Sequence, residues 1–318
     1  MPLGEFELIA KYFTHPVRRA VLGVGDDCAL LAPAPGMQLA ISSDMLVEGR
    51  HFLSTVASAD LGHKALAVNL SDLAACGARP LGFTLALALP RADEDFLGGF
   101  SRGLLALADQ QGCELIGGDT TQGPLNICIT VVGELPTGQA LLRSGAQAGD
   151  DLYVSAALGD ARLALECFRG HAALPGDGFT RVRRAMERPQ PRIALGIALR
   201  GLASSAIDLS DGLLGDLGHI LRRSGLGATV FVDDVPRSAE LMSMPPALQR
   251  ECTLAGGDDY ELLFTCAAPR ADEVQAAAQH AAVAVTRIGR VEAQPGLRLI
   301  DAHGRSVKNT FVAFDHFR

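Results

Sequence analysis

Two kinds of apolar segment alternate along the chain, and their spacing predicts an α/β protein. Nearly continuous apolar runs are typical of buried strands, whereas apolar residues three or four positions apart are typical of amphipathic helices. In the first half, the expected helices cover 5–13, 60–77 and 94–111, and the expected strands cover 38–42, 83–89 and 126–135. An apolar segment at 21–24 runs into Gly25, and Leu115-Ile116 leads into a predicted turn at 117–121.

The second half repeats this alternation. Its expected strands are 151–155, 229–232, 261–266, 283–291 and 297–300, its expected helices are 161–168, 192–202 and 213–221, and 170–179 is expected to be a loop. Residues 136–151 contain Pro136 and three glycines and form the best linker between the halves. With 318 residues, the chain is about the right length for two domains. We therefore predict domains at 1–148 and 149–318, each a mixed sheet covered by helices (α+β layered).

Composition narrows the functional classes. A net charge of −8 argues against a nucleic-acid-binding surface. The seven cysteines form no C-x-x-C pair, which argues against a zinc site or a disulfide framework and favours a reduced, cytoplasmic setting. Glu5 and Glu7 stand where a signal peptide would carry basic and then apolar residues, and the longest apolar run is too short to cross a membrane. We expect a soluble protein that binds neither nucleic acid nor membrane.

Acidic motifs recur beside the apolar segments. They are Gly25-Asp26-Asp27, Ser42-Ser43-Asp44, Asn69-Leu70-Ser71-Asp72, Gly117-Gly118-Asp119-Thr120-Thr121, Asp208-Leu209-Ser210-Asp211 and Gly256-Gly257-Asp258-Asp259. Any one of them is as readily a turn or a helix cap. Carboxylates converge, however, only when a cation offsets their repulsion, and hard oxygen ligands suit Mg²⁺ that is shared with phosphates. The set therefore predicts phosphoryl chemistry.

Signatures of other nucleotide enzymes are missing. The chain has no G-x-x-x-x-G-K-[ST] loop, no kinase catalytic loop and no G-x-S-x-G elbow. Gly23-Val24-Gly25 lacks the third glycine of the Rossmann spacing. The histidines are isolated and match no zinc pattern. These absences argue against the P-loop, dinucleotide-binding, protein-kinase and hydrolase classes and against a zinc site, and no histidine stands out as a general base.

The motifs together resemble a known family. Those that carry the resemblance are Gly4-Glu5-Phe6, Val24-Gly-Asp-Asp-Cys-Ala, Ala67-Val-Asn-Leu-Ser-Asp-Leu-Ala-Ala, Leu115-Ile-Gly-Gly-Asp-Thr-Thr, Arg143-Ser-Gly-Ala, Ser205-Ala-Ile-Asp-Leu-Ser-Asp-Gly, Gly257-Asp-Asp-Tyr-Glu-Leu and Asp315-His-Phe. They span nearly the full length and are similar to the thiamine-monophosphate kinase family of the aminoimidazole ribonucleotide synthetase-like superfamily. The resemblance implies the two-domain fold of that superfamily. It also implies transfer of the terminal phosphate of ATP to thiamine monophosphate, the last step of thiamine diphosphate biosynthesis, assisted by several Mg²⁺ ions.

The resemblance also implies roles for single residues. The implied metal ligands are Asp27, Ser43, Asp44, Asp72, Asp119, Asp208 and Asp211. The implied ATP-binding residues are Gly118, Asp119, Arg143 and Ser210, and those near the thiamine substrate are His51, Asp258 and Phe314. The family often has Tyr or Trp at the last position, and a phenyl ring keeps the stacking face without the polar group. The roles of Asp26 and Asp259, as metal ligands or turn residues, stay open.

Assembly and two rival functions complete the expectations. The superfamily resemblance implies a homodimer in which N-terminal strands pack across the two-fold axis and the nucleotide binds nearby. One rival is a sister enzyme that uses ATP on another substrate, such as a formylglycinamidine ribonucleotide cyclo-ligase or a selenophosphate synthetase. The other is a non-catalytic metal- or nucleotide-binding protein with structural acidic turns. ATP turnover and product identity distinguish the three.

Overall fold

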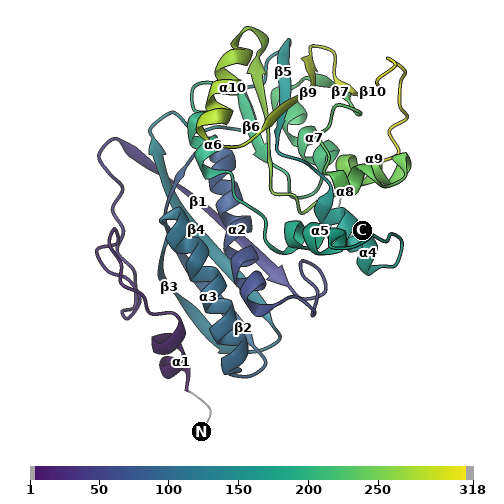
Figure 1. The fold of residues 1–318 in the computed structure, drawn as a ribbon. Helices are drawn as coiled ribbons and strands as arrows, with labels where there is room; N and C mark the ends of the chain where they lie inside the picture. Colours follow the sequence, from purple (N-terminus) through teal and green to yellow (C-terminus); the bar gives the residue numbers. More distant parts are fainter. Residues whose placement is uncertain (1–3, 313–318) are drawn as a thin grey trace. The chain divides into compact units, whose positions relative to one another are not determined.

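A computed structural model describes residues 4–312, and within it the chain forms two compact units (Figure 1). The first unit contains the residues up to Leu73 together with Ala78–Gly138. The second contains Ala74–Gly77, which is the end of a helix, and the chain from Gln139 onward. Each unit has its own sheet and its own helices, as the two-domain α/β prediction requires.

The first unit is built on a four-stranded mixed sheet with the order β1-β4-β2-β3. Its strands are β1 (Met37–Val47), β2 (Arg79–Leu89), β3 (Glu114–Gln122) and β4 (Asn126–Pro136). β4 is antiparallel to both β1 and β2, and β2 is parallel to β3. β1 and β4 pair in register from Met37↔Pro136 to Val47↔Asn126 without a bulge, whereas β2 has a register shift against each neighbour. Successive side chains of β1 therefore alternate between the two faces of the sheet along its whole length.

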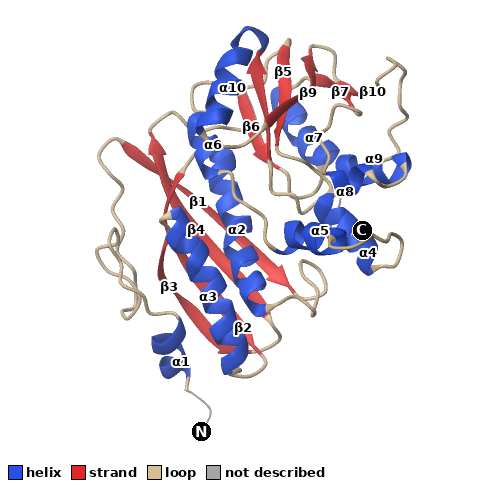
Figure 2. Ribbon diagram, in the orientation of Figure 1, coloured by secondary structure: helices blue, strands red, loops and turns tan. Residues whose placement is uncertain are grey.

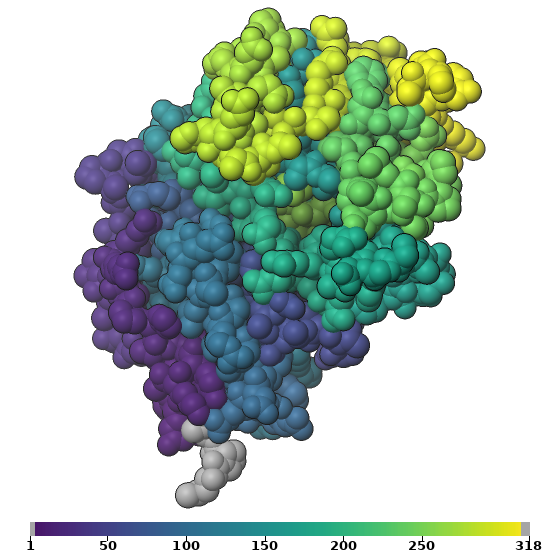
Figure 3. Space-filling view, in the orientation of Figure 1, coloured from purple at the N-terminus to yellow at the C-terminus, as the bar shows by residue number. Residues whose placement is uncertain are grey.

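Two long helices, α2 (Ser58–Cys76) and α3 (Glu94–Gln111), cover one face of this sheet (Figure 2). α3 begins at an Asp93 cap and ends at Gly112, whose φ of 61° is left-handed. Part of α3 is visible at the surface (Figure 3), while residues 61–71 of α2 are all buried. The helices approach so closely that a Cβ on Gly103 would lie 1.8 Å from the backbone oxygen of Ala59. A short helix, α1 (Glu5–Tyr12), packs against α3 and β3.

The second unit is built on a six-stranded mixed sheet with the order β10-β7-β9-β5-β8-β6. Its strands are β5 (Asp150–Ser155), β6 (Ser205–Asp208), β7 (Gly227–Phe231), β8 (Leu262–Ala267), β9 (Val285–Glu292) and β10 (Gly296–Ile300). β10 and β7 are parallel, and the other neighbours are antiparallel. The sheet is therefore mixed, and β6 lies at one edge beside β8.

Of the helices in this unit, α7 (Leu213–Ser224) and α10 (Ala271–His280) pack against strands of the sheet. The others are α4 (Asp160–Phe168), α5 (Gly178–Glu187), α6 (Ile193–Ala198), α8 (Ala239–Met242) and α9 (Pro246–Ala255). Leu152, Val154 and Leu263 share one apolar core with Leu217 and Ile220 of α7. Tyr153 and Phe264 alternate with these residues and stack 5.4 Å apart on the opposite face. The period of two in the buried strands thus explains why both faces need helices.

Most of the expected elements are present, and three kinds of expectation are corrected. The predicted turn at 117–121 is wrong, because Gly117–Thr121 continue β3 as far as Gln122. The strand expected at 38–42 is only part of β1, and 21–24 forms isolated bridges rather than a strand. Helices α5, α8, α9 and α10 and strand β6 were not anticipated. Among residues 4–312, no helix combines the length and the apolar character needed to cross a bilayer.

Candidate active site

β1 and α2 bring two of the predicted metal ligands, Asp44 and Asp72, to one place in the first unit. The backbone N–H of Asp44 donates to Oδ1 of Asn69 at 3.0 Å. The hydroxyl of Ser42 donates to Oδ2 of Asp72. Ser42 and Asp44 are two apart on a strand, and Asn69 and Asp72 are three apart on a helix, so each pair shares one face. Both carboxylates therefore lie where β1 meets α2.

Ser43 lies on the opposite face of β1. Its hydroxyl pairs with Oγ1 of Thr130 at 2.9 Å and with the backbone oxygen of Ile129 at 3.2 Å. Ser42, not Ser43, contacts Asp72, and strand alternation is the signal that would have singled it out. Over residues 4–312, no three His, Cys, Asp or Glu side chains are grouped closely enough to hold a metal ion. The predicted ligands are distributed over both units.

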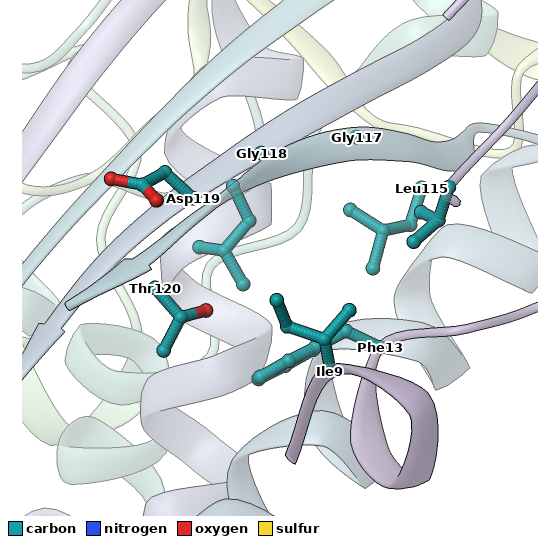
Figure 4. Close-up of a pocket in the computed structure, with 9 residues that line it drawn as sticks. Ile9, Phe13, Leu115, Gly117, Gly118, Asp119 and Thr120 are labelled. Carbon is teal, nitrogen blue, oxygen red and sulfur yellow. The ribbon is translucent and has the colours of Figure 1, made fainter. Parts of the chain in front are cut away.

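Gly118 and Asp119 lie in β3, opposite Leu85 and Ala86 of β2. Gly118 has a φ of 144°, and a Cβ there would lie 1.9 Å from the backbone oxygen of Leu85, so the position requires glycine. Asp119 is exposed and borders a pocket of about 40 Å³ between β3 and α1, a volume suited to a few waters rather than to a nucleotide. Figure 4 shows its carboxylate directed away from the apolar side chains of Ile9 and Phe13.

The segment that carries Asp27 is held to β3 by a carboxylate that we did not predict. Glu114 accepts hydrogen bonds from the backbone N–H groups of Arg18, Arg19 and Ala20 at 2.7–3.1 Å. Partial burial opposes ionisation of Glu114, but these donors outweigh it and lower the pKa of its carboxyl. Asp27 itself is exposed, and its N–H donates to Oδ1 of Asp26 at 3.0 Å. Asp26 thus makes a contact within its own turn.

We expect Glu114→Gln to destabilise the anchored segment by about 1–2 kcal/mol at neutral pH, because the charge and one acceptor are lost. A carboxyl whose pKa is lowered on folding stabilises above its ordinary value of 4.5, and this contribution disappears as the pH falls through the lower folded value. The difference in Tm from the unsubstituted protein should therefore be largest near pH 7 and shrink below pH 4.5. Trypsin should also cleave faster after Arg18 and Arg19.

Glu94→Gln is the matched control for this prediction. It removes the partner of Lys11 in an exposed ion pair, and such pairs contribute little to stability. A Tm difference for Glu114→Gln that stays constant down to about pH 3, or an unchanged tryptic pattern, would contradict the anchoring role.

His51 follows β1 in a half-buried position. Its Nδ1 accepts a hydrogen bond from the backbone N–H of Val47 at 3.0 Å. In the neutral ring the proton is therefore on Nε2, and that nitrogen is a donor for a neighbouring group.

In the second unit, two acidic motifs that are far apart in sequence lie side by side. Asp208 is the last residue of β6, is 5% exposed and pairs with Leu262 of β8. The N–H of Asp258 donates to the backbone oxygen of Ser210 at 2.8 Å, and the N–H of Tyr260 donates to that of Leu209 at 2.8 Å. A Cβ on Gly257 would lie 2.4 Å from the backbone oxygen of Ser210. The loop after β6 and the loop before β8 are therefore adjacent. Between them they carry residues predicted to bind metal, nucleotide and substrate.

The loop around Asp258 is strained. Asp258 has a φ of 73° and Tyr260 a φ of 52°, and side-chain-bearing residues seldom adopt these values. Such strain persists where the surroundings fix the backbone, and it is concentrated at functional sites. The two hydrogen bonds to the loop after β6 provide that constraint.

Asp259 has a structural contact of its own. Both of its oxygens accept from the N–H of Gly159, at 3.0 and 3.1 Å, where α4 begins. Burial raises the pKa of its carboxyl well above the ordinary value, although this hydrogen bond opposes the shift. Asp259 therefore ties its loop to the start of α4.

A second unpredicted carboxylate, Asp216, lies under the loop after β6. It is 3% exposed, and its Oδ2 accepts from the N–H groups of Asp211 and Gly212, each at 3.1 Å. Burial and then the charge of Asp211 raise the pKa of Asp216 to about 7, while the two hydrogen bonds and the charge of Arg143 oppose the shift. Arg143 is exposed. Phe314, the last of the predicted site residues, lies outside the described part of the chain.

Comparisons with known proteins give relatives over the whole length of the chain. Residues 25–135 match the model of the AIR synthase related protein, N-terminal domain, and residues 147–302 match that of the C-terminal domain. The thiamine-monophosphate kinase of Escherichia coli (strain K12) is 46% identical over 325 residues, and that of Salmonella typhimurium (strain LT2) is 45% identical over 325 residues. Each alignment covers 100% of this chain and 99% of the relative.

Solved structures give the same result. The thiamine-monophosphate kinase from Stenotrophomonas maltophilia K279a superposes with a TM-score of 0.85 at 45% identity, covering 91% of this chain and 92% of that one. AaThiL complexed with AMPPCP and TMP superposes with a TM-score of 0.77 at 29% identity, covering 90% of this chain and 89% of that one. The hydrogenase maturation protein HypE in complex with ATP, at 21% identity, shares the fold.

Proposed function

The chain belongs to the AIR synthase related family and, within it, to the thiamine-monophosphate kinases, and from this membership we propose how its residues carry out the reaction. It is an ATP-dependent kinase that phosphorylates thiamine monophosphate to thiamine diphosphate. The observation that carries this conclusion is full-length identity of 45–46% to enzymes of that activity. The complex of AaThiL with AMPPCP and TMP supports direct transfer between the two phosphorylated molecules.

Both reactants are anionic, so the protein must offset their repulsion before they meet. We assign this to Mg²⁺ held by Asp27, Asp44, Asp72, Asp119, Asp208 and Asp211, with a further oxygen from the backbone of Ser43, because the hydroxyl of Ser43 lies on the opposite face of β1. The donor set fits, because it consists of oxygen atoms alone, as Mg²⁺ prefers. When bound, the ions neutralise phosphate charge and align an in-line transfer. No general base is needed, because the attacking phosphate oxygen is already deprotonated at neutral pH.

The remaining assignments concern nucleotide and substrate. For ATP we propose Gly118, Asp119, Arg143 and Ser210: the missing side chain of Gly118 permits close approach, and the guanidinium of Arg143 is suited to bidentate phosphate contact. For thiamine monophosphate we propose His51, Asp258 and Phe314. His51 offers the Nε2–H donor, the Asp258 carboxylate complements the cationic thiazolium ring, and Phe314 supplies a stacking face.

We further propose a homodimer formed through the uncovered face of β1. Leu39, Ile41 and Met45 alternate along it and are 42%, 66% and 53% exposed. An apolar row on a regular strand is typical of a surface that a second copy covers. We also propose a cytoplasmic location without nucleic-acid or membrane partners, which is consistent with the net charge of −8 and with seven free cysteines.

Ile41→Lys should weaken the dimer at least about thirtyfold, because a charge replaces a central apolar contact and appears twice in a two-fold interface. Sedimentation velocity over a concentration series measures the shift. Val312→Lys is the control, since Val312 is 81% exposed and lies in the second unit. A monomeric unsubstituted protein, or an unchanged dimer in Ile41→Lys, would refute this interface.

Asp211→Asn should raise the Mg²⁺ concentration needed for half-maximal activity by about ten- to a hundredfold, because it removes a charged ligand from the cluster. Titration of the initial rate with Mg²⁺ at saturating ATP and thiamine monophosphate provides the value. An unchanged titration would remove Asp211 from the metal site.

The function itself is tested by incubating the pure protein with ATP, Mg²⁺ and thiamine monophosphate and separating the products by chromatography. Thiamine diphosphate and ADP should appear together and disappear with EDTA. ADP without thiamine diphosphate would indicate a sister enzyme with another acceptor. Folded protein that forms no ADP would indicate a binding protein.

A further inference from the structure

Asp216 is a buried carboxylate to which the proposed reaction gives no role. It is the fourth residue of α7, and its backbone N–H donates to the oxygen of Gly212 at 3.0 Å. Its Oδ2 accepts in return from the N–H of Gly212 and also from that of Asp211. Gly212 and Asp216 therefore hold each other by a reciprocal pair of hydrogen bonds.

This contact differs from ordinary helix capping. A capping side chain precedes the helix and accepts from N–H groups within its first turn. Here the side chain lies within the helix and accepts from two residues that precede it, while Gly212 offers no side-chain cap. The hydrogen bonds of Asp216 therefore fix the loop rather than the helix end.

Three constraints meet at this loop. Gly212 has a φ of 116°, and a Cβ there would lie 2.9 Å from the backbone oxygen of Ala255. The N–H of Asp258 holds the oxygen of Ser210 from one side, and Asp216 holds the N–H of Asp211 from the other. Between these contacts the backbone of Ser210 and Asp211 has little freedom. Asp216 is the contact that a side-chain substitution can remove.

We propose that Asp216 is a positioning residue that fixes the peptide groups of Asp211 and Gly212, and so sets the geometry with which the loop after β6 binds Mg²⁺ and nucleotide. The inference rests on the proposed function. Residues behind metal ligands typically change metal affinity or activity ten- to a hundredfold when they are replaced. Because the role depends on an acceptor oxygen, an amide oxygen at the same place should fulfil it.

Asp216→Ala and Asp216→Asn separate this role from others. Asp216→Ala should raise the half-saturating Mg²⁺ concentration about tenfold or more, with a smaller loss of kcat at saturating Mg²⁺. Asp216→Asn should stay within about threefold of the unsubstituted enzyme, since Oδ1 of asparagine accepts the same two N–H groups. The affinity for Mn²⁺ in the presence of AMPPCP, followed by electron paramagnetic resonance, should change in parallel. Asp93→Ala, which removes an ordinary cap from α3, is the matched control and should leave both titrations unchanged.

Each result has one consequence. Unchanged Mg²⁺ and Mn²⁺ titrations in folded Asp216→Ala would overturn the inference, as would an Asp216→Asn enzyme impaired tenfold or more. If Asp216→Ala does not fold, Asp216→Leu takes its place with the same expected rise in the half-saturating Mg²⁺ concentration, because leucine has a similar branched shape and no acceptor oxygen. Failure of the proposed function differs from all of these, because the unsubstituted enzyme would then form no thiamine diphosphate or bind no Mn²⁺, and both proposals would be rejected.

Discussion

Asp72→Asn is expected to lower kcat by at least about a thousandfold while leaving the fold intact. Asparagine has the same shape as aspartate, and its amide oxygen still accepts the hydroxyl of Ser42, so packing at the junction of β1 and α2 is kept. What disappears is a negative charge that we assign to metal binding, and losing one such electrostatic contact to a transferring group costs several kcal/mol in the transition state.

Thiamine diphosphate formation gives kcat, and the far-ultraviolet circular dichroism spectrum with the Tm reports the fold. Because Asp72 is half-buried within α2, removing its charge should leave the Tm of the metal-free protein unchanged or slightly higher. Asp109→Asn, at an exposed position of α3, should retain full activity. Normal turnover and Mg²⁺ dependence in Asp72→Asn would exclude Asp72 as a ligand.

Gly103→Ala is expected to destabilise the protein by more than about 3 kcal/mol. Helix propensity alone favours alanine over glycine by about 1 kcal/mol. That gain is overridden, because the new Cβ would lie 1.8 Å from the oxygen and 2.6 Å from the carbonyl carbon of Ala59, and the backbone of α2 must move. Separating the helices would also leave voids in a close-packed layer.

Gly98→Ala on the same helix is the matched control. A Cβ there meets only the ends of the Arg102 and Tyr12 side chains, at 3.5 and 3.8 Å, so the substitution should be neutral or stabilising by up to about 1 kcal/mol. Urea unfolding of the two variants measures the contrast. A Gly103→Ala protein as stable as Gly98→Ala would show that the helices separate at little cost.

Sequence patterns correctly predicted helices that have an apolar stripe facing one sheet. They failed for segments of unusual composition and for segments that are held by contacts with distant parts of the chain. α3 has an apolar stripe, an Asp93 cap and a Gly112 end, and its predicted range is confirmed. α5 was missed because it is rich in arginine, and β3 was cut short because glycine and aspartate were interpreted as turn residues. In β3 these residues are held by pairing with β2, a long-range contact that no local pattern contains.

The same distinction applies to the site. Acidic residues beside glycine or serine were visible as motifs, and the pairing of the loops after β6 and before β8 was not. Glu114, Asp216 and Asn69 escaped prediction because each acts through hydrogen bonds with backbone N–H groups that lie near it only in the folded chain. Ser42 was available to sequence reasoning, since alternation along β1 separates it from Ser43.

The uninterrupted register of β1 limits which insertions and deletions this chain can accept during evolution. Of its even-numbered residues, Ser42 and Asp44 contact α2, and the odd-numbered Leu39, Ile41 and Met45 form the apolar row proposed for assembly. Deleting or inserting one residue would turn Ser42 and Asp44 outward and Leu39 and Ile41 inward in a single step. Length variation is therefore expected in the loops and not in this strand. Chemistry and association must then be gained or lost together, because eleven consecutive backbone positions encode both.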